Sequence, residues 1–548
     1  MDRTIPICKI LLVVAGLSAS SLAVAKTDEP VDRYAAARLA EIANREDEAL
    51  KAYVKLSRDA PDSAVLADRI FDSAIRTGDM TAALRAVRAQ ELRGEVSSEA
   101  PLLLFADAFR RKNWPMALIA ADELSSRSNL AFMAPILRSW TNAAQGKPHN
   151  LPTADAQVDP LFAYYAEDQR VYFELNAGEL ATAKQSLRGL AVMGADYTRD
   201  VLLSAAPVIR ANGDDMFADA LIGTAMGADR LSVASLPPDR KQRASLAPED
   251  GLAALHVRIA SALLEQKIDE PALVLARMAI WYAPDSASAN LVLARALSAQ
   301  GLDASALETL EKIPSTSPYW PRAIGQRVAQ MEPTAALALA RYAVQQWPKS
   351  GSLVLVLAQS QETIGDLDGA ADSYRRIADA ADKGGSTPRQ RAGYRLQLAR
   401  ALDNAGNWAG ARSNLDAGLV IDSNNAQILN YLGYSLLERQ EDVPRAMAMI
   451  QRAFEVAPDS TAIMDSMGWA HFQTGNYAQA VVLLEKAAKV LGNDPAINEH
   501  LGDAYWRVGL LRDARYAWRV ASQAAKGEAA ARIAGKIDTG LAQAAFRR

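Results

Sequence analysis

The stretch that decides the fold is His500–Ala521, which reads HLGDAYWRVGLLRDARYAWRVA. Its spaced residues are a large–small pair, an aromatic residue and a glycine, followed by a small, an aromatic and a small residue: Leu501-Gly502, Tyr505, Gly509, Ala514, Trp518 and Ala521. Intervals of three and four residues on each side of Gly509 are typical of two helices joined by a glycine turn. The small residues mark the points where the two backbones approach each other.

The same spacing recurs upstream. The clearest units begin at these large–small pairs: Met467-Gly468, Leu432-Gly433, Leu398-Ala399, Leu357-Ala358, Leu293-Ala294 and Ile259-Ala260. Toward the N-terminus the pattern is degenerate but stays in register, with these markers: Gly213 with Ala218, Gly178 with Ala183, Gly78 with Ala83, and Ala49 with Tyr53. Many units in phase predict a repeat array, in which each unit buries its apolar face against its neighbours.

The repeated unit resembles the tetratricopeptide repeat, whose two antiparallel helices occupy about 34 residues. The bulk composition agrees, because 548 residues with 50% hydrophobic and 6% aromatic content are too many for one compact core. The resemblance implies an all-α fold, a superhelical solenoid of tetratricopeptide-type helix pairs.

Two proline-containing stretches interrupt the array, at 146–160 and 232–250. Proline pairs and polar residues of this kind do not continue a helix. We therefore predict these domains: a degenerate helical array over 26–231, a Pro-rich loop over 232–250, a regular array over 251–525, and a capping helix or tail over 526–548.

The N-terminus has the order of a secretory signal peptide. Arg3 and Lys9 precede an apolar stretch over 10–17, and Ala23-Val24-Ala25 supplies a small-residue cleavage site. A membrane anchor is the alternative, but the apolar stretch is shorter than the roughly 20 residues that a span needs. We predict a signal peptide over 1–25, a periplasmic location and no transmembrane segment in the mature chain.

The single cysteine, Cys8, lies before the apolar stretch, so the sequence does not predict a lipoprotein. Lys+Arg 60 against Asp+Glu 64 gives a net charge of -4, which offers no basic excess for nucleic acid. No phosphate-binding loop occurs, and His149, His256, His471 and His500 lack the spacing of metal ligands. We predict no catalytic residue, no cofactor, no metal site and no enzymatic activity.

The repeat also predicts where a partner binds, because the first helix of each pair lines the inner groove of such an array. In the last three units, polar and aromatic side chains recur at the inward positions around the small residue. The predicted partner-binding groove consists of Asn430, Tyr434, Asp465, Trp469, Phe472, Glu499, Asp503, Trp506 and Arg507. The alternative is that Trp469 and Trp506 only cover the core of the neighbouring repeat, since aromatic residues dominate helix packing too.

The stretch from Leu429 to Ala521 is similar to the end of bacterial envelope tetratricopeptide proteins, among them lipoprotein adaptors of carboxy-terminal processing proteases. This resemblance implies a protein-binding scaffold whose partners are envelope proteins, including a periplasmic serine protease and its substrates. The chain departs from those adaptors in lacking a cysteine at the end of the signal peptide. The alternative function is a component of an exopolysaccharide synthesis or export machine. The partner, the oligomeric state and the curvature of the array do not follow from the sequence.

Overall fold

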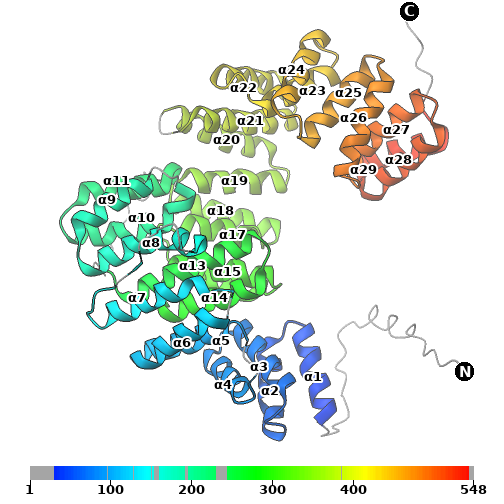
Figure 1. Ribbon diagram of the computed structural model, residues 1–548. Helices are drawn as coiled ribbons and strands as arrows, with labels where there is room; N and C mark the ends of the chain where they lie inside the picture. Colours follow the sequence, from blue (N-terminus) through cyan, green and yellow to red (C-terminus); the bar gives the residue numbers. More distant parts are fainter. Residues whose placement is uncertain are drawn as a thin grey trace, which may run out of the picture. The chain divides into compact units, whose positions relative to one another are not determined.

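A computed structural model describes residues 30–94, 97–127, 129–149, 151–152, 159–191, 195–229, 243–383 and 386–541. The predicted signal peptide lies outside these residues. Those residues form α-helices and two short 3-10 helices, with no strand among them (Figure 1). Consecutive helices pack as antiparallel pairs, which confirms the predicted all-α array of helix pairs.

The helices belong to two compact units. The first unit comprises Met1–Glu179 and Ser245–Thr309, as far as these residues are described. Its helices are α1 (Pro30–Ile42), α2 (Glu46–Asp59), α3 (Ala64–Thr77), α4 (Met80–Leu92), α5 (Ala100–Arg110), α6 (Trp114–Arg127), η1 (Ala131–Met133), α7 (Ala134–Ala144), α8 (Pro160–Ala177), α13 (Pro248–Glu265), α14 (Asp269–Tyr282) and α15 (Ala287–Ala299). The division between the units falls within α16 (Asp303–Glu311).

The second unit comprises Leu180–Ala244 and Leu310–Arg548, again as far as described. Its N-terminal helices are α9 (Leu180–Ala191), α10 (Ala195–Ala211), α11 (Asp215–Met226) and η2 (Gly227–Asp229). Its remaining helices are α17 (Trp320–Val328), α18 (Pro333–Gln346), α19 (Gly351–Thr363), α20 (Leu367–Asp382), α21 (Pro388–Asn404), α22 (Trp408–Ile421), α23 (Ala426–Glu438), α24 (Val443–Val456), α25 (Thr461–Gln473), α26 (Tyr477–Val490), α27 (Pro495–Arg507), α28 (Leu511–Ala524) and α29 (Gly527–Thr539).

The two units are interleaved in the sequence, because the chain leaves the first unit after residue 179 and returns to it at residue 245. Most of the predicted boundary loop, 232–242, lies outside the described residues, and α13 already begins at Pro248. The predicted domain boundaries therefore stay a prediction.

Small residues hold the C-terminal pairs together at the predicted positions. A Cβ atom on Gly433, Gly468 or Gly502 would lie 2.8 Å from Ile450 Cγ1, 2.7 Å from Leu484 Cγ or 2.4 Å from Trp518 Cδ1, respectively. Side chains do not tolerate such distances, so only glycine lets the second helix approach the first this closely. This is the packing that the large–small pairs predict.

The returning helix α13 packs on α7 and α8 in the first unit. Trp140 of α7 is fully buried, stacks on Phe173 at 4.0 Å between ring centroids, and donates its Nε1–H to Gln169 Oε1 at 2.7 Å. Gly251 of α13 packs directly against the Trp140 ring, since a Cβ atom on Gly251 would lie 2.0 Å from Trp140 Cζ2. The indole therefore fills the space that Gly251 leaves open.

The following helix, α14, is joined to α3 by a half-buried arginine, Arg277. Arg277 donates from Nε to the Ile75 carbonyl at 2.8 Å and from Nη2 to the Arg76 carbonyl, so it satisfies carbonyls of the last turn of α3. Burial lowers the pKa of Arg277 to about 10, which leaves the guanidinium charged near neutral pH. The contact ties two helices about two hundred residues apart in the sequence.

In the second unit, Asp229 of η2 joins the early segment to the repeat array. Asp229 Oδ1 accepts from Ser350 Oγ at 2.6 Å and from the Ser352 backbone N–H at 3.1 Å. Ser352 Oγ donates to the other carboxylate oxygen, Oδ2, at 2.5 Å. Because Ser350 is the N-cap of α19, the carboxylate also lies where the helix dipole favours negative charge.

His256 of α13 is a histidine buried in the first unit. The side chain is fully buried, and its Nδ1 lies 2.7 Å from the Leu252 carbonyl oxygen. Its Nε2 has no hydrogen-bond partner among the described residues. Burial, opposed by the Leu252 carbonyl, lowers the pKa of His256 from 6.5 to about 4. The folded protein therefore holds this imidazole neutral at pH values where the unfolded chain protonates it.

We expect His256 to destabilise the protein as the pH falls from about 6.5 to about 4, because the unfolded chain binds the proton more tightly. The total loss is about 3 kcal/mol, at roughly 1.4 kcal/mol for each unit of pKa shift. Urea unfolding of the wild type and of His256→Leu across this range measures the effect. The free energy of unfolding should fall more steeply in the wild type, and parallel curves would contradict the assignment.

Candidate protein-binding groove

The nine residues of the predicted groove lie on the first helices of the last three helix pairs, α23, α25 and α27. Neighbouring first helices contact each other, α23 with α25 and α25 with α27 (Figure 1). Asn430 and Tyr434 lie on α23, Asp465, Trp469 and Phe472 on α25, and Glu499, Asp503, Trp506 and Arg507 on α27. The repeat therefore places equivalent positions on adjacent helices.

The centre of this row is a cluster around Trp469. Its ring stacks on Phe472 with centroids 4.7 Å apart and on His500 with centroids 4.2 Å apart. Its Nε1–H donates to Glu438 Oε1 at 2.5 Å, which connects α25 to α23. Trp469 and Phe472 are both half-buried, so the cluster is neither fully in the core nor fully in solvent.

His500 connects α27 to α25, since its Nδ1 lies 2.9 Å from Asp465 Oδ1. Burial lowers the pKa of His500, but Asp465 and the more distant Asp503 and Glu499 outweigh it and raise the pKa above its ordinary value. The imidazole therefore holds its proton to higher pH than a free histidine. Asp465 accepts a charge-assisted hydrogen bond whenever His500 is protonated.

Tyr434 brings a hydroxyl to the same region. Burial raises its pKa, and the Glu438, Asp465 and Glu499 carboxylates raise it further. The phenol therefore stays protonated at physiological pH. Its hydroxyl makes no hydrogen bond to another described residue, so it is available as a donor or an acceptor for a ligand.

The acidic end of the row already has partners within the chain. Arg532 of α29 donates from Nε and Nη2 to the two Glu499 carboxylate oxygens, both at 2.8 Å. Lys536, one helical turn further, donates to Glu499 Oε1 at 2.7 Å and to Asp503 Oδ2 at 2.6 Å. The helix α29 therefore covers these two carboxylates with two cations.

The two carboxylates respond differently to this environment. Burial raises the pKa of Glu499, but the hydrogen bonds and charges of Arg532 and Lys536 outweigh burial and bring the pKa down to about 2. Asp503 is more deeply enclosed, and burial raises its pKa despite Lys536 and the hydrogen bond from Trp518. Glu499 is therefore the carboxylate that α29 holds ionised.

Trp506 belongs to the packing under α29. Its ring lies 5.5 Å from that of the fully buried Trp518, with the Arg515 guanidinium 5.1 Å from its centroid. A Cβ atom on Gly540 would lie 2.1 Å from Trp506 Cζ2, so the chain after α29 runs directly against the indole. Ile533, Ile537 and Leu541 of the predicted capping tail pack on the same cluster.

Two of the predicted groove residues have buried polar atoms without a hydrogen-bond partner in the described part of the chain. Asn430 Oδ1 and Arg507 Nε are buried and have no hydrogen-bond partner among the described residues. Buried polar atoms without a partner are unusual in proteins and accept one readily. Sequence reasoning missed Glu438 and His500, although Glu438 lies four residues after Tyr434 and so on the same helix face. The sequence interpretation placed His500 on a helix face as a structural residue and predicted no metal site from it.

The structure therefore distinguishes two parts of the row. We call the first part the open groove; it consists of Asn430, Tyr434, Glu438, Asp465, Trp469, Phe472 and His500, and its described hydrogen bonds join α23, α25 and α27. Arg507, the last residue of α27, belongs to neither part. The covered end consists of Glu499, Asp503 and Trp506, which α29 and the residues after it contact.

Two further features are absent from the part of the chain that the structure describes. No three histidine, cysteine, aspartate or glutamate side chains there come together as a metal-binding group. None of the described helices combines the length and the apolar character that crossing a membrane requires.

Comparison with known proteins identifies tetratricopeptide repeats in the C-terminal half. The sequence model of that repeat matches residues 327–385 and 396–461. A TPR repeat-containing protein of Pseudomonas aeruginosa is 38% identical over 95 residues, which are 17% of this chain and 16% of that protein. The chain thus matches about a sixth of the length of this relative.

Two of the similar solved structures align with most of the chain. Yeast Tom70 aligns with 93% of this chain and 95% of its own at 12% identity and a TM-score of 0.37. The APC/C hetero-tetramer Cut9-Hcn1 aligns with 94% of this chain and 96% of that one at 15% identity and a TM-score of 0.38. At such TM-scores these likenesses carry no argument about what this protein binds.

Proposed function

We propose that this protein is a non-enzymatic scaffold of the bacterial periplasm that holds other proteins, and that the open groove binds a basic segment of a partner. The tetratricopeptide repeats support the general role, because such arrays mediate protein–protein interactions. The periplasmic location rests on the signal-peptide pattern at residues 1–25.

The docking of α29 is the observation that carries the proposal of a basic ligand. Arg532 and Lys536 lie four residues apart on one helix face, and they occupy Glu499 and Asp503 at the inward positions of α27. The equivalent positions of the two preceding first helices include Asp465, which His500 contacts, and Tyr434. Glu438 lies one turn after Tyr434 on α23. Carboxylates beside rigid aromatic side chains are well suited to arginine or lysine side chains.

A narrower proposal is that the partner is an envelope protease, which the protein assists by holding its substrates. The similarity of 429–521 to envelope adaptors of carboxy-terminal processing proteases supports it. The alternative is a role in exopolysaccharide synthesis or export. Affinity purification of the full protein from the native envelope, followed by mass spectrometry, separates the two. Enrichment of a periplasmic serine protease supports the adaptor, whereas enrichment of only glycosyltransferases or porins contradicts it.

We expect Trp469→Ala to lower the capture of the groove's partner at least tenfold while helical content stays nearly unchanged. The half-buried indole positions Glu438 through its Nε1–H and packs on His500, so its removal disorganises the open groove without opening the core. Aromatic residues at such positions contribute about 2 kcal/mol or more to binding. Capture assays and far-UV circular dichroism measure the two quantities.

Tyr516→Ala is the matched control, because Tyr516 is 70% exposed on α28 and lies outside the groove. Trp506 is left unchanged in this test, because it packs under α29 and its removal would disturb that contact as well. Undiminished capture by Trp469→Ala would contradict the proposed groove. A cooperative loss of helix in the same variant would instead identify Trp469 as a core residue.

A further inference from the structure

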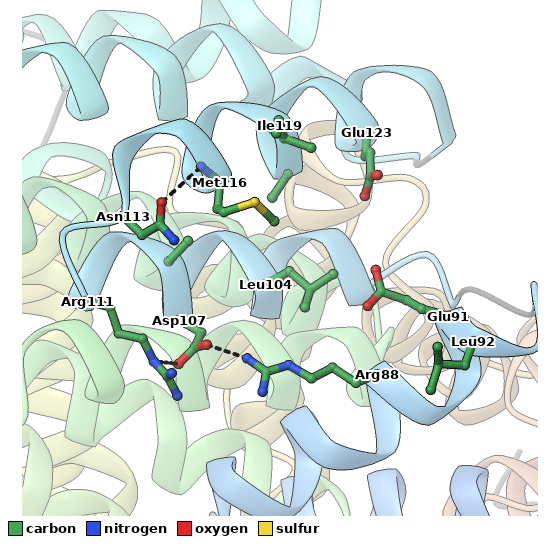
Figure 2. Close-up of a pocket in the computed structure, with 12 residues that line it drawn as sticks. Arg88, Glu91, Leu92, Leu104, Asp107, Arg111, Asn113, Met116, Ile119 and Glu123 are labelled. Atoms are coloured by element: carbon green, nitrogen blue, oxygen red, sulfur yellow. Dashed lines mark hydrogen bonds and ion pairs between the residues drawn. The ribbon is translucent and has the colours of Figure 1, made fainter.

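A second concave surface lies in the first unit, between α4 and α6 with α5 as its floor (Figure 2). It encloses about 700 Å³. Helix α4 packs only lightly on α5, whereas α2 packs closely on α3 at the equivalent junction. The gap between the two helix pairs therefore leaves a groove, which we call the α4–α6 groove, where the other junction is closed by packing.

The walls of this groove are apolar and exposed. Leu92 of α4 is 91% exposed, and Met116 and Ile119 of α6 are 50% and 48% exposed. Leu104 of α5 lies on the floor between them (Figure 2). Large apolar side chains scattered singly over a surface are ordinary, but a group that converges on one cavity is typical of a binding site.

The two ends of the groove carry different charges. At one end Glu91 of α4 and Glu123 of α6 face each other (Figure 2). Burial raises the pKa of Glu91, and the Glu123 charge raises it further against the opposing effect of Arg88. Among the described side chains, the cation nearest in effect is Arg88, and its hydrogen bond goes to Asp107 rather than to either glutamate.

At the other end two arginines share one carboxylate, which leaves a net charge of +1. Arg88 Nη2 and Arg111 Nε donate to the two Asp107 carboxylate oxygens, at 2.9 Å and 2.8 Å (Figure 2). The negative charge of the groove therefore lies at the Glu91–Glu123 end, and this is the end that attracts a cation.

We propose that the α4–α6 groove receives one amphipathic helix of a partner protein, whose apolar face covers Leu92, Met116 and Ile119 and whose lysine or arginine reaches Glu91 and Glu123. This surface is separate from the open groove of the C-terminal repeats, so the inference does not depend on the proposed function of that groove.

The geometry favours a helix over an extended strand. The walls are helices, whose backbone groups are satisfied internally and cannot pair with an added strand. Met116, Ile119 and Glu123 follow each other at three- and four-residue intervals, and such a ridge packs between the side chains of another helix. The wall from Asn113 to Glu123 spans about 15 Å at 1.5 Å per residue, which suits about three turns of a partner helix.

Three synthetic peptides test the proposal with the full-length protein. Each is an Ala-rich helix of about 16 residues with end caps and leucines at positions i, i+3, i+4 and i+7, a length at which helicity is appreciable. They differ only at two central positions beside the leucine stripe, which carry lysine, glutamine or glutamate. Circular dichroism establishes equal helicity, and fluorescence anisotropy of a terminal label measures binding.

The expected order of affinity is lysine, then glutamine, then glutamate, with about tenfold between the first and the last at low salt. Glu91→Gln with Glu123→Gln should abolish that order without abolishing binding. Met116→Asp should weaken all three peptides at least tenfold, because it places a charge in the apolar wall. Met216→Asp is the matched control, since Met216 is 83% exposed on α11, outside this groove, and should change nothing.

Absence of saturable binding at about 100 μM, a weak affinity for such an interaction, would overturn the proposal. Equal affinity for the lysine and glutamate peptides, or no effect of Met116→Asp, would also overturn it. Sedimentation analysis tests a second copy of the chain as the occupant, and self-association lost in Met116→Asp would replace the partner helix with that copy. Trp469→Ala separates the two surfaces, because it should leave peptide binding unchanged even if the proposed function of the open groove fails.

Discussion

Gly251→Ala is expected to destabilise the first unit by about 3 kcal/mol, within the range that overpacking and misfitting of a dense core produce. The added methyl group would lie 2.0 Å from Trp140 Cζ2 and 2.4 Å from Cη2, so either the indole or α13 must move. Moving the indole breaks its 2.7 Å hydrogen bond to Gln169 and its stacking on Phe173. Both changes loosen the contact through which α13 packs on α7 and α8.

Urea unfolding followed by far-UV circular dichroism and tryptophan fluorescence measures this loss. Gly393→Ala is the matched control, because Gly393 also lies within a helix, α21, and nothing lies within 4 Å of its added Cβ atom. That substitution should stabilise the protein slightly, by about 0.5–1 kcal/mol, since alanine restricts the unfolded chain more than glycine does. If both variants shift the unfolding midpoint in the same direction and by the same amount, the packing of Trp140 on Gly251 is wrong.

Arg532→Glu combined with Lys536→Glu is expected to release α29 from the repeat array. The double variant removes the two cations that hydrogen-bond to Glu499 and Asp503 in the described structure and places like charges beside these buried carboxylates. Removing one side of a buried ion pair costs about 3–5 kcal/mol. We expect this loss to exceed the stabilisation that the apolar contacts of α29 provide. Trp506 and Trp518 should then become accessible to solvent.

Hydrogen exchange over α29 and tryptophan fluorescence report the release. Arg512→Glu with Arg519→Glu is the matched control, because both arginines are exposed on α28 and the change in net charge is the same. Unaltered exchange over α29 would contradict the role of the two cations. In the wild type, the contribution of Glu499 should be present above its unfolded pKa of 4.5 and be lost as the pH falls toward about 2.

Part of the open groove could be predicted from the repeat offsets alone. The inward residues Tyr434, Asp465 and Trp469 could be chosen because equivalent offsets from the small residue occupy equivalent places on successive helices. The hydrogen bond of Trp469 to Glu438 and that of His500 to Asp465 join residues 31 and 35 positions apart, about one repeat. Such contacts follow from the repeat once its register is known, although the sequence alone did not single them out.

The docking of α29 on the covered end could not be predicted from the repeat offsets. Glu499 and Asp503 have the same offsets as the open positions, yet α29 occupies them through Arg532 and Lys536. This tail has no repeat pattern that fixes its register against α27. Its position depends on the sum of its charges and of the apolar contacts of Ile533 with the Trp518 cluster.

By itself, the sequence determined the helix pairs and their close packing, because the period of a helix and the need for small residues at Gly433, Gly468 and Gly502 act over one repeat. Only the tertiary structure decided that α13 returns to α7 and α8, with Gly251 against Trp140 more than a hundred residues away, and that α4 and α6 leave a groove between them. The physical reason is range. The periodicity of a helix depends on residues that are near each other in the sequence. The packing of helices that are distant in the sequence depends instead on the shapes and charges of whole surfaces.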